Sequence, residues 1–243
     1  NADYADYHFD CSGEYTVGTK TIHCHNNKRH GSEDLKTSFA NSCNSSYASL
    51  GLTLDLEQFD DLCDQMLFNT ALPTDFESSK SSFVLEPGDS DSAVMETSIG
   101  QGKTLVTPFH MALIASAIAN DGVLMKPYVI DSVQSTEGSV IEQYESENYG
   151  TLMSASESSQ LTKMMKAVVE EGTGYKLSGK NYSVAGKTGT AEVVGRGNNA
   201  WFVGFAPADD PKIAICVLVE DAGTASSEAV PIAGEILDAY LNN

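Results

Sequence analysis

The residues best suited to chemistry lie in the segment 186–192, which reads Gly-Lys-Thr-Gly-Thr-Ala-Glu. The pattern predicts a β-strand, yet the segment carries small side chains, hydroxyls and one cation in place of bulky β-branched residues. Gly189 leaves room for another chain to approach closely. Lys187 supplies a positive charge, and Thr188 and Thr190 add hydroxyl donors beside it. Together they predict a site that holds a substrate carboxylate while the strand edge pairs with the substrate backbone.

The charge of the whole chain strengthens the case for Lys187. The chain has 243 residues with 14 basic and 34 acidic side chains, which give a formal net charge of −20. In so acidic a protein an anionic substrate is favoured only where a cation has been placed. The alternative is a solvated edge strand with a chance lysine. Sparse, scattered Lys and Arg argue against a nucleic acid partner, and the negative charge argues against binding to an anionic membrane surface.

A second polar segment, Ser42-Cys43-Asn44, precedes the lysine segment by about 140 residues. Alone, the pattern Ser-x-Asn is a weak signal, because a polar helix start or a turn explains it equally well. It gains weight from the Lys-Thr-Gly sequence at 187–189 further along the chain.

These two segments, in this order, resemble the second and third motifs of the penicillin-binding proteins, after the family's Ser-x-x-Lys. Three further segments resemble the family: 99–102 with the following Thr-Pro at 107–108, 171–174 and 200–207. The separation of the motifs is closer to that of a transpeptidase than to that of a compact serine β-lactamase. The resemblance implies a D,D-transpeptidase that cross-links peptidoglycan stem peptides ending in D-Ala-D-Ala. It also implies binding of β-lactams, and no cofactor or metal at the site.

The resemblance assigns a role to each residue of the two motifs. Ser42 relays a proton towards the leaving D-Ala nitrogen, and the Asn44 amide hydrogen-bonds the substrate backbone. Lys187 holds Ser42 in place and makes the local field positive. Thr188 and Thr190 bind the terminal carboxylate. The Thr190 N–H forms half of the oxyanion hole, a donor worth about 3 kcal/mol.

The sequence departs from the family at the nucleophile, because no Ser-x-x-Lys occurs in its 243 residues. In the family this motif precedes Ser-x-Asn by several tens of residues, and the nearest pattern here, Thr173-Gly-Tyr-Lys176, lies far downstream. We therefore expect 1–243 to be a partial transpeptidase domain, truncated after the nucleophile's helix and inactive by itself. The alternatives are a non-catalytic sensor or scaffold that binds peptidoglycan or β-lactams, and a serine β-lactamase.

The elements that must position these motifs follow from periodicity and capping signals. Thr107-Pro108 is a favourable N-cap and first-turn pair, and Ser154 with Glu157 forms a capping box. Helices are expected at 54–68, 107–120, 154–171 and 228–241, strands at 183–194, 200–206 and 212–220, and a hairpin at 126–144. Short turns between adjacent strands predict an antiparallel sheet with helices packed on it, an α+β (in looser usage α/β) fold. From the family's five-stranded sheet we expect three strands here, plus a helical region around Ser42.

The cysteines leave several alternatives open. There are five of them, at positions 11, 24, 43, 63 and 216. Cys63 and Cys216 fall in a helical and a strand pattern, which indicates buried free thiols. Cys11 and Cys24 lie near three histidines, at positions 23, 25 and 30. A disulfide, a metal site and unpaired thiols all fit, although the spacing matches no standard zinc pattern.

No purely apolar run, 111–114 included, approaches the roughly 20 residues that span a bilayer. No signal peptide opens the chain, whose polar and aromatic start is typical of the middle of a domain. The resemblance places the protein on the extracytoplasmic face of the bacterial membrane, with its anchor outside this chain. An apolar surface left uncovered by truncation would favour dimerisation or strand exchange.

Overall fold

The computed structural model describes residues 6–242. Its centre is an antiparallel sheet in the order β11-β10-β9, formed by β9 (Ala185–Ala191), β10 (Asn198–Ala206) and β11 (Ile213–Ala222). Thr188 pairs with Phe202, and Lys187 with Val203, so the lysine motif lies on an outer strand. β9 pairs only with β10 among the described residues, which leaves its other edge unpaired.

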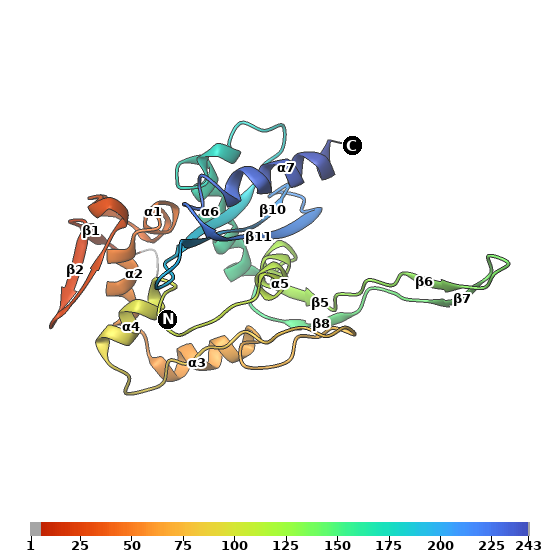
Figure 1. The fold of residues 1–243 in the computed structure, drawn as a ribbon, viewed down its shortest axis with the longest axis horizontal. Coiled ribbons are helices and arrows are strands. Elements are labelled where there is room, and N and C mark those ends of the chain that lie inside the picture. Colours follow the sequence, from red (N-terminus) through yellow and green to blue (C-terminus); the bar gives the residue numbers. More distant parts are fainter. Residues whose placement is uncertain (1–5, 243) are drawn as a thin grey trace.

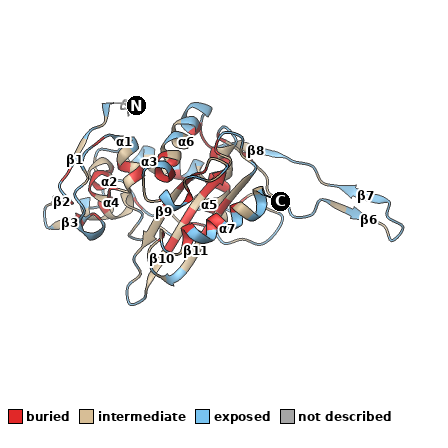
Figure 2. Cartoon of the chain, turned by 90° about the horizontal axis from the view of Figure 1, so that it is seen from above, coloured by how far each residue is buried: buried red, intermediate tan, exposed pale blue. Residues whose placement is uncertain are grey.

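Helices cover both faces of this sheet (Figure 1). On one face α5 (Pro108–Ala119) and α6 (Ala155–Glu170) bury Phe205, which is fully shielded from solvent. On the other face α7 (Ala229–Leu241) buries Phe202. The buried residues, red in Figure 2, gather where the sheet meets these helices. The alternation of side chains along β10 therefore supplies two cores from one strand.

The helix boundaries follow from side-chain caps. The Thr107 side chain accepts a hydrogen bond from the backbone N–H of His110, and Pro108 opens α5. Ser154 and Glu157 form a reciprocal capping box at the start of α6. These caps satisfy backbone donors that the first helical turn leaves without partners.

The N-terminal part of the chain, up to α4, forms a separate layer beside the sheet (Figure 1, red to yellow). It contains two short antiparallel ladders and four helices. The strands are β1 (Phe9–Cys11), β2 (Glu14–Val17), β3 (Lys20–His23) and β4 (Gly31–Glu33). The helices are α1 (Leu35–Asn41), α2 (Asn44–Gly51), α3 (Leu56–Gln65) and α4 (Asp91–Ser98). Two contacts link it to the main body: α1 packs on α6, and Leu67 and Leu72, after α3, join the core beneath α5.

Two glycines allow backbones to approach where side chains would collide. A Cβ at Gly172, just after α6, would lie 2.2 Å from the carbonyl oxygen of Ala40 in α1. A Cβ at Gly186 in β9 would lie 2.3 Å from the ring of Phe202. Both distances are shorter than real Cβ contacts, so the absence of a side chain is a packing requirement at each position.

A long hairpin extends away from the body (Figures 1 and 2). Its base is the pair β5 (Val123–Met125) and β8 (Asn148–Thr151), and its tip is the pair β6 (Ser132–Gln134) and β7 (Val140–Gln143). Every residue of β7 is exposed.

The structure confirms the α+β fold and corrects several details. The three expected strands form the main sheet, but the described residues hold eight more strands in four two-stranded ladders. The expected hairpin is present, although its strands are shorter than predicted. Cys63 is buried as expected, whereas Cys216 is only partly buried.

We expect Ser154→Ala to lower the free energy of unfolding by about 1 kcal/mol, because it removes the hydroxyl that accepts from the backbone N–H of Glu157 in the α6 capping box. Chemical denaturation measures the loss. Ser156→Ala, in the exposed first turn of the same helix, is the matched control and should change stability little. Equal losses in the two variants would show that the cap contributes nothing specific.

Candidate active site

The site is built on a contact between two residues that lie 145 positions apart in the sequence. The Nζ of Lys187 donates hydrogen bonds to the Oγ of Ser42 at 2.9 Å and to the backbone oxygen of Thr188 at 2.8 Å. The same Nζ lies 5.5 Å from the ring centre of Phe39, within range of a cation–π interaction. The contact therefore joins the edge strand β9 to the helical layer.

Burial controls the charge of Lys187. Desolvation lowers the pKa of its ammonium to about 8. No carboxylate of the described residues forms an ion pair with it. Near neutral pH the side chain thus carries a positive charge that no protein anion compensates. Such a charge attracts an anionic ligand group.

Ser42 sits in a strained backbone turn between two helices. It caps the C-terminus of α1 with φ 54° and ψ 51°, in the left-handed region that few residues other than glycine adopt. The neighbouring Cys43 is the N-cap of α2, and its N–H donates to the carbonyl of Ser38 at 2.9 Å. Packing of both helices thus holds a conformation that costs on the order of 1 kcal/mol.

Asn44 is the first residue of α2, directly after the turn. Its Nδ2 donates to the backbone oxygen of His23 at 3.0 Å, which ties the turn to the end of β3. No donor among the described residues reaches its side-chain oxygen. The amide oxygen therefore remains able to accept a hydrogen bond from a ligand.

Two threonines of β9 have partners that the sequence did not reveal. The hydroxyl oxygens of Thr188 and Thr173 lie 2.5 Å apart, and the Thr190 hydroxyl accepts from the N–H of Ala225 at 3.0 Å. Thr173 lies in the segment 171–174, which we noted as similar to the family without giving it a role. Gly189, next to them, contacts only Trp201 at the position of its absent Cβ.

A cleft of about 280 Å³ opens beside Ser42. Its walls come from the N-terminal layer and from the end of α6. They are formed by His25, Lys28, His30, Asn41, Ser42, Glu171, Gly172 and Thr173. The cleft thus places Ser42 and Thr173 on one surface. These two residues contact Lys187 and Thr188 of β9, respectively.

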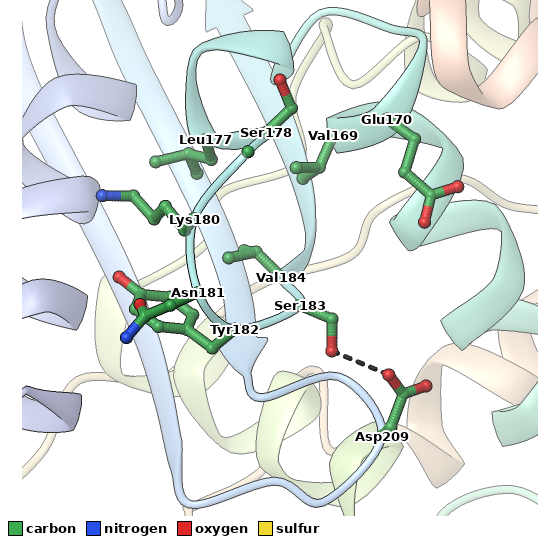
Figure 3. Close-up of a pocket in the computed structure, with 11 residues that line it drawn as sticks. Val169, Glu170, Leu177, Ser178, Lys180, Asn181, Tyr182, Ser183, Val184 and Asp209 are labelled. Atoms are coloured by element: carbon green, nitrogen blue, oxygen red, sulfur yellow. Dashed lines mark hydrogen bonds between the residues drawn. The ribbon is translucent and has the colours of Figure 1, made fainter.

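A larger hollow of about 410 Å³ lies elsewhere, near the start of β9 (Figure 3). Two of its polar side chains already have protein partners: Ser183 pairs with Asp209 at 2.9 Å within the hollow, and Lys180 pairs with Asp238 of α7 at 2.5 Å. None of the motif residues lines it. We therefore assign the candidate active site to the Ser42 cleft and the adjoining edge of β9.

The chain belongs to the family of penicillin-binding protein transpeptidase domains, which matches residues 3–238. A peptidoglycan D,D-transpeptidase PbpA from Mycolicibacterium smegmatis is 32% identical over 219 residues, which are 85% of this chain and 44% of that protein. Stage V sporulation protein D from Bacillus subtilis is 31% identical over 238 residues, 93% of this chain and 36% of that protein. The chain thus spans less than half the length of these curated relatives.

Solved structures show the same fold. Penicillin-binding protein A from M. tuberculosis, as a ceftriaxone acyl-enzyme complex, superposes with a TM-score of 0.88 at 26% identity, covering 97% of this chain and 56% of that one. The D,D-transpeptidase domain of a peptidoglycan glycosyltransferase from Eggerthella lenta gives a TM-score of 0.85 at 26% identity, covering 98% and 61%.

We expect the side chain of Lys187 to titrate near pH 8. Lysine side-chain NMR, with the signal assigned through Lys187→Arg, measures the midpoint. The folded protein releases this proton well below the value of about 10.4 for an unfolded chain, so the group raises stability as pH increases between the two values. A midpoint near 10.4 would contradict the buried, unpaired ammonium. Lys163, which is exposed on α6, is the internal control.

Proposed function

We propose that this chain supplies the Ser-x-Asn and Lys-Thr-Gly elements of a peptidoglycan D,D-transpeptidase. The observation that carries the proposal is the hydrogen bond from Lys187 to Ser42, which joins both motifs into one site. Similarity to a peptidoglycan D,D-transpeptidase and to a penicillin-binding protein seen as a β-lactam acyl-enzyme supports it. In this proposal the ligands are stem peptides ending in D-Ala-D-Ala and the β-lactams that compete with them.

The edge of β9 recognises the substrate. Its unpaired backbone groups can add the stem peptide as a further strand. The positive charge of Lys187 and the hydroxyls of Thr188 and Thr190 then bind the terminal carboxylate, which both D-Ala-D-Ala and β-lactams carry. The side-chain oxygen of Asn44, to which none of the described residues donates, accepts a hydrogen bond from the substrate backbone.

The proposed reaction is acyl transfer through a serine ester. A serine hydroxyl attacks the penultimate D-Ala carbonyl, the oxyanion is held in part by the Thr190 N–H, and the C–N bond to the last D-Ala breaks. Ser42, held by Lys187, passes the proton to the leaving nitrogen. An amine of a neighbouring stem peptide then attacks the ester and releases the serine.

The attacking serine belongs to a Ser-x-x-Lys motif that the 243 residues do not contain. The chain by itself is therefore proposed to bind these ligands without being acylated. We also propose that the chain can dimerise, through the apolar surface that truncation would leave uncovered. Because peptidoglycan is the proposed substrate, the proposed reaction takes place on the extracytoplasmic face of the membrane. No helix among residues 6–242 is long and apolar enough to cross a bilayer.

We expect diacetyl-Lys-D-Ala-D-Ala to shift the amide NMR signals of β9 at millimolar concentration. Lys187→Met should abolish the shifts because the carboxylate loses its counter-charge. Lys163→Met, which removes an exposed lysine from α6, is the matched control. The same peptide with a C-terminal amide should bind at least tenfold more weakly, since it has no carboxylate. Equal binding of acid and amide peptides would refute recognition through Lys187.

We expect no covalent adduct when the chain is incubated with a labelled penicillin and weighed by intact mass spectrometry. An adduct on Ser42 would show that this residue is itself a nucleophile. A chimera that carries the Ser-x-x-Lys segment of the M. smegmatis relative separates the proposed enzyme from a sensor or scaffold. If the protein is a transpeptidase, the chimera should be acylated by the penicillin. A folded chimera that is not acylated would favour the non-catalytic sensor or scaffold.

A further inference from the structure

Three buried cysteines and one histidine meet beside Ser42, in a cluster that the proposed reaction does not use. Cys11 ends β1, Cys24 follows β3, His30 precedes β4, and Cys43 lies between α1 and α2. Their coordinating atoms all lie within 4.8 Å of one another. Four separate segments of the N-terminal layer (Figure 1, red and orange) thus converge on one point.

Three of the six distances between these ligand atoms match those of a tetrahedral metal site. The Sγ of Cys24 lies 3.7 Å from the Sγ of Cys11 and 3.7 Å from the Sγ of Cys43. Two thiolates bound at about 2.3 Å to one Zn²⁺ at the tetrahedral angle are about 3.8 Å apart. The Sγ of Cys11 lies 3.4 Å from the Nδ1 of His30, and a zinc-bound sulfur and imidazole nitrogen are about 3.5 Å apart.

A disulfide explains the cluster less well. Bonded sulfurs lie about 2.05 Å apart, whereas Cys24 keeps the same longer distance to both of its neighbours. All three thiols are free. A disulfide would also leave the third cysteine unpaired and give the imidazole of His30 no role.

The surroundings support bound thiolates. The hydroxyl of Ser45 lies 3.2 Å from the Sγ of Cys24, where it can donate a hydrogen bond to a ligating sulfur. Three thiolates, one neutral imidazole and Zn²⁺ carry a net charge of −1, and Lys28 and Arg29 precede His30 directly in the chain. His23 and His25 are exposed and stay outside the cluster.

The N-terminal layer has a small apolar core, so a bound metal would add to its stability. The apolar cluster around the three thiols contains only one further residue among those described, the partly buried Phe9. Both ladders here have two strands each, an arrangement that is marginal without additional support. A structural zinc site supplies folding free energy where the apolar core is small.

We propose that Cys11, Cys24, His30 and Cys43 bind one Zn²⁺ in a closed, four-coordinate structural site. Cys43 separates Ser42 from Asn44, so the ion would anchor the turn that presents both side chains. All four coordination positions would be filled by protein ligands, which leaves none open for substrate or water. Because His30 also lines the Ser42 cleft, the ion would lie next to that cleft.

The first test is the metal content of the purified chain incubated with Zn²⁺ and passed through a desalting column. Elemental analysis should find about one zinc per chain. Cys24→Ser and His30→Ala should lose it, while Cys63→Ser and Cys216→Ser, which change thiols outside the cluster, should retain it. Co²⁺ in place of Zn²⁺ should give thiolate-to-metal charge-transfer absorption in the wild type and not in Cys24→Ser.

A second measurement stands even if the ligand variants do not fold. In the wild type, a maleimide should react with Cys11, Cys24 and Cys43 only after a chelator has removed zinc, as read by peptide mass spectrometry. The chelated protein should also unfold at a lower temperature. A folded wild type that retains no zinc, or one whose intact mass shows two hydrogens lost to a disulfide, would overturn the proposal. Neither result affects the test of peptide binding at Lys187.

Discussion

A desolvated ammonium group must find hydrogen-bond partners, and the site is arranged around that requirement at the half-buried Lys187. Burial removes water from the Nζ, and the Ser42 hydroxyl and the Thr188 carbonyl replace part of the lost solvation. The first partner comes from the helical layer and the second from the strand itself. The charged side chain therefore keeps both hydrogen bonds only while the helical layer and β9 hold their positions relative to each other.

Contacts that do not involve Lys187 hold the helical layer and β9 in this relative position. The N–H of Thr173 donates to the carbonyl of Ala40 at 3.1 Å, and the Thr173 hydroxyl meets that of Thr188. The end of α6 thus touches both α1 and β9, the two elements that present Ser42 and Lys187. Because α6 also packs on the sheet, strain in the left-handed turn at Ser42 is held by a large part of the fold.

Much of this arrangement could be predicted from local signals. The caps at Thr107 and Ser154 and the short turns between strands predicted α5, α6 and the main sheet, because these features act within a few residues. The motif residues were found through their types and order. The structure then added their geometry, above all the 2.9 Å contact between Lys187 and Ser42.

The rest could not be predicted, because it depends on contacts between distant segments. Strands β1 to β4 are three or four residues long, too short for an alternating pattern such as that of β2 to set them apart from loops. No pattern in the sequence indicates that Thr173 and Thr188, which lie in different segments, form a hydrogen bond. Likewise, only the fold shows that His30, and not His23 or His25, faces the cysteines.

The glycine after α6 has a consequence for how this domain can adapt. Since the backbone at Gly172 rests against the Ala40 carbonyl, the width of the cleft is fixed by main-chain contact and not by side-chain size. A single substitution there cannot narrow the entrance without separating the helices that form it. A ligand of different shape must therefore be accommodated by the other residues that line the cleft, while this wall stays the same.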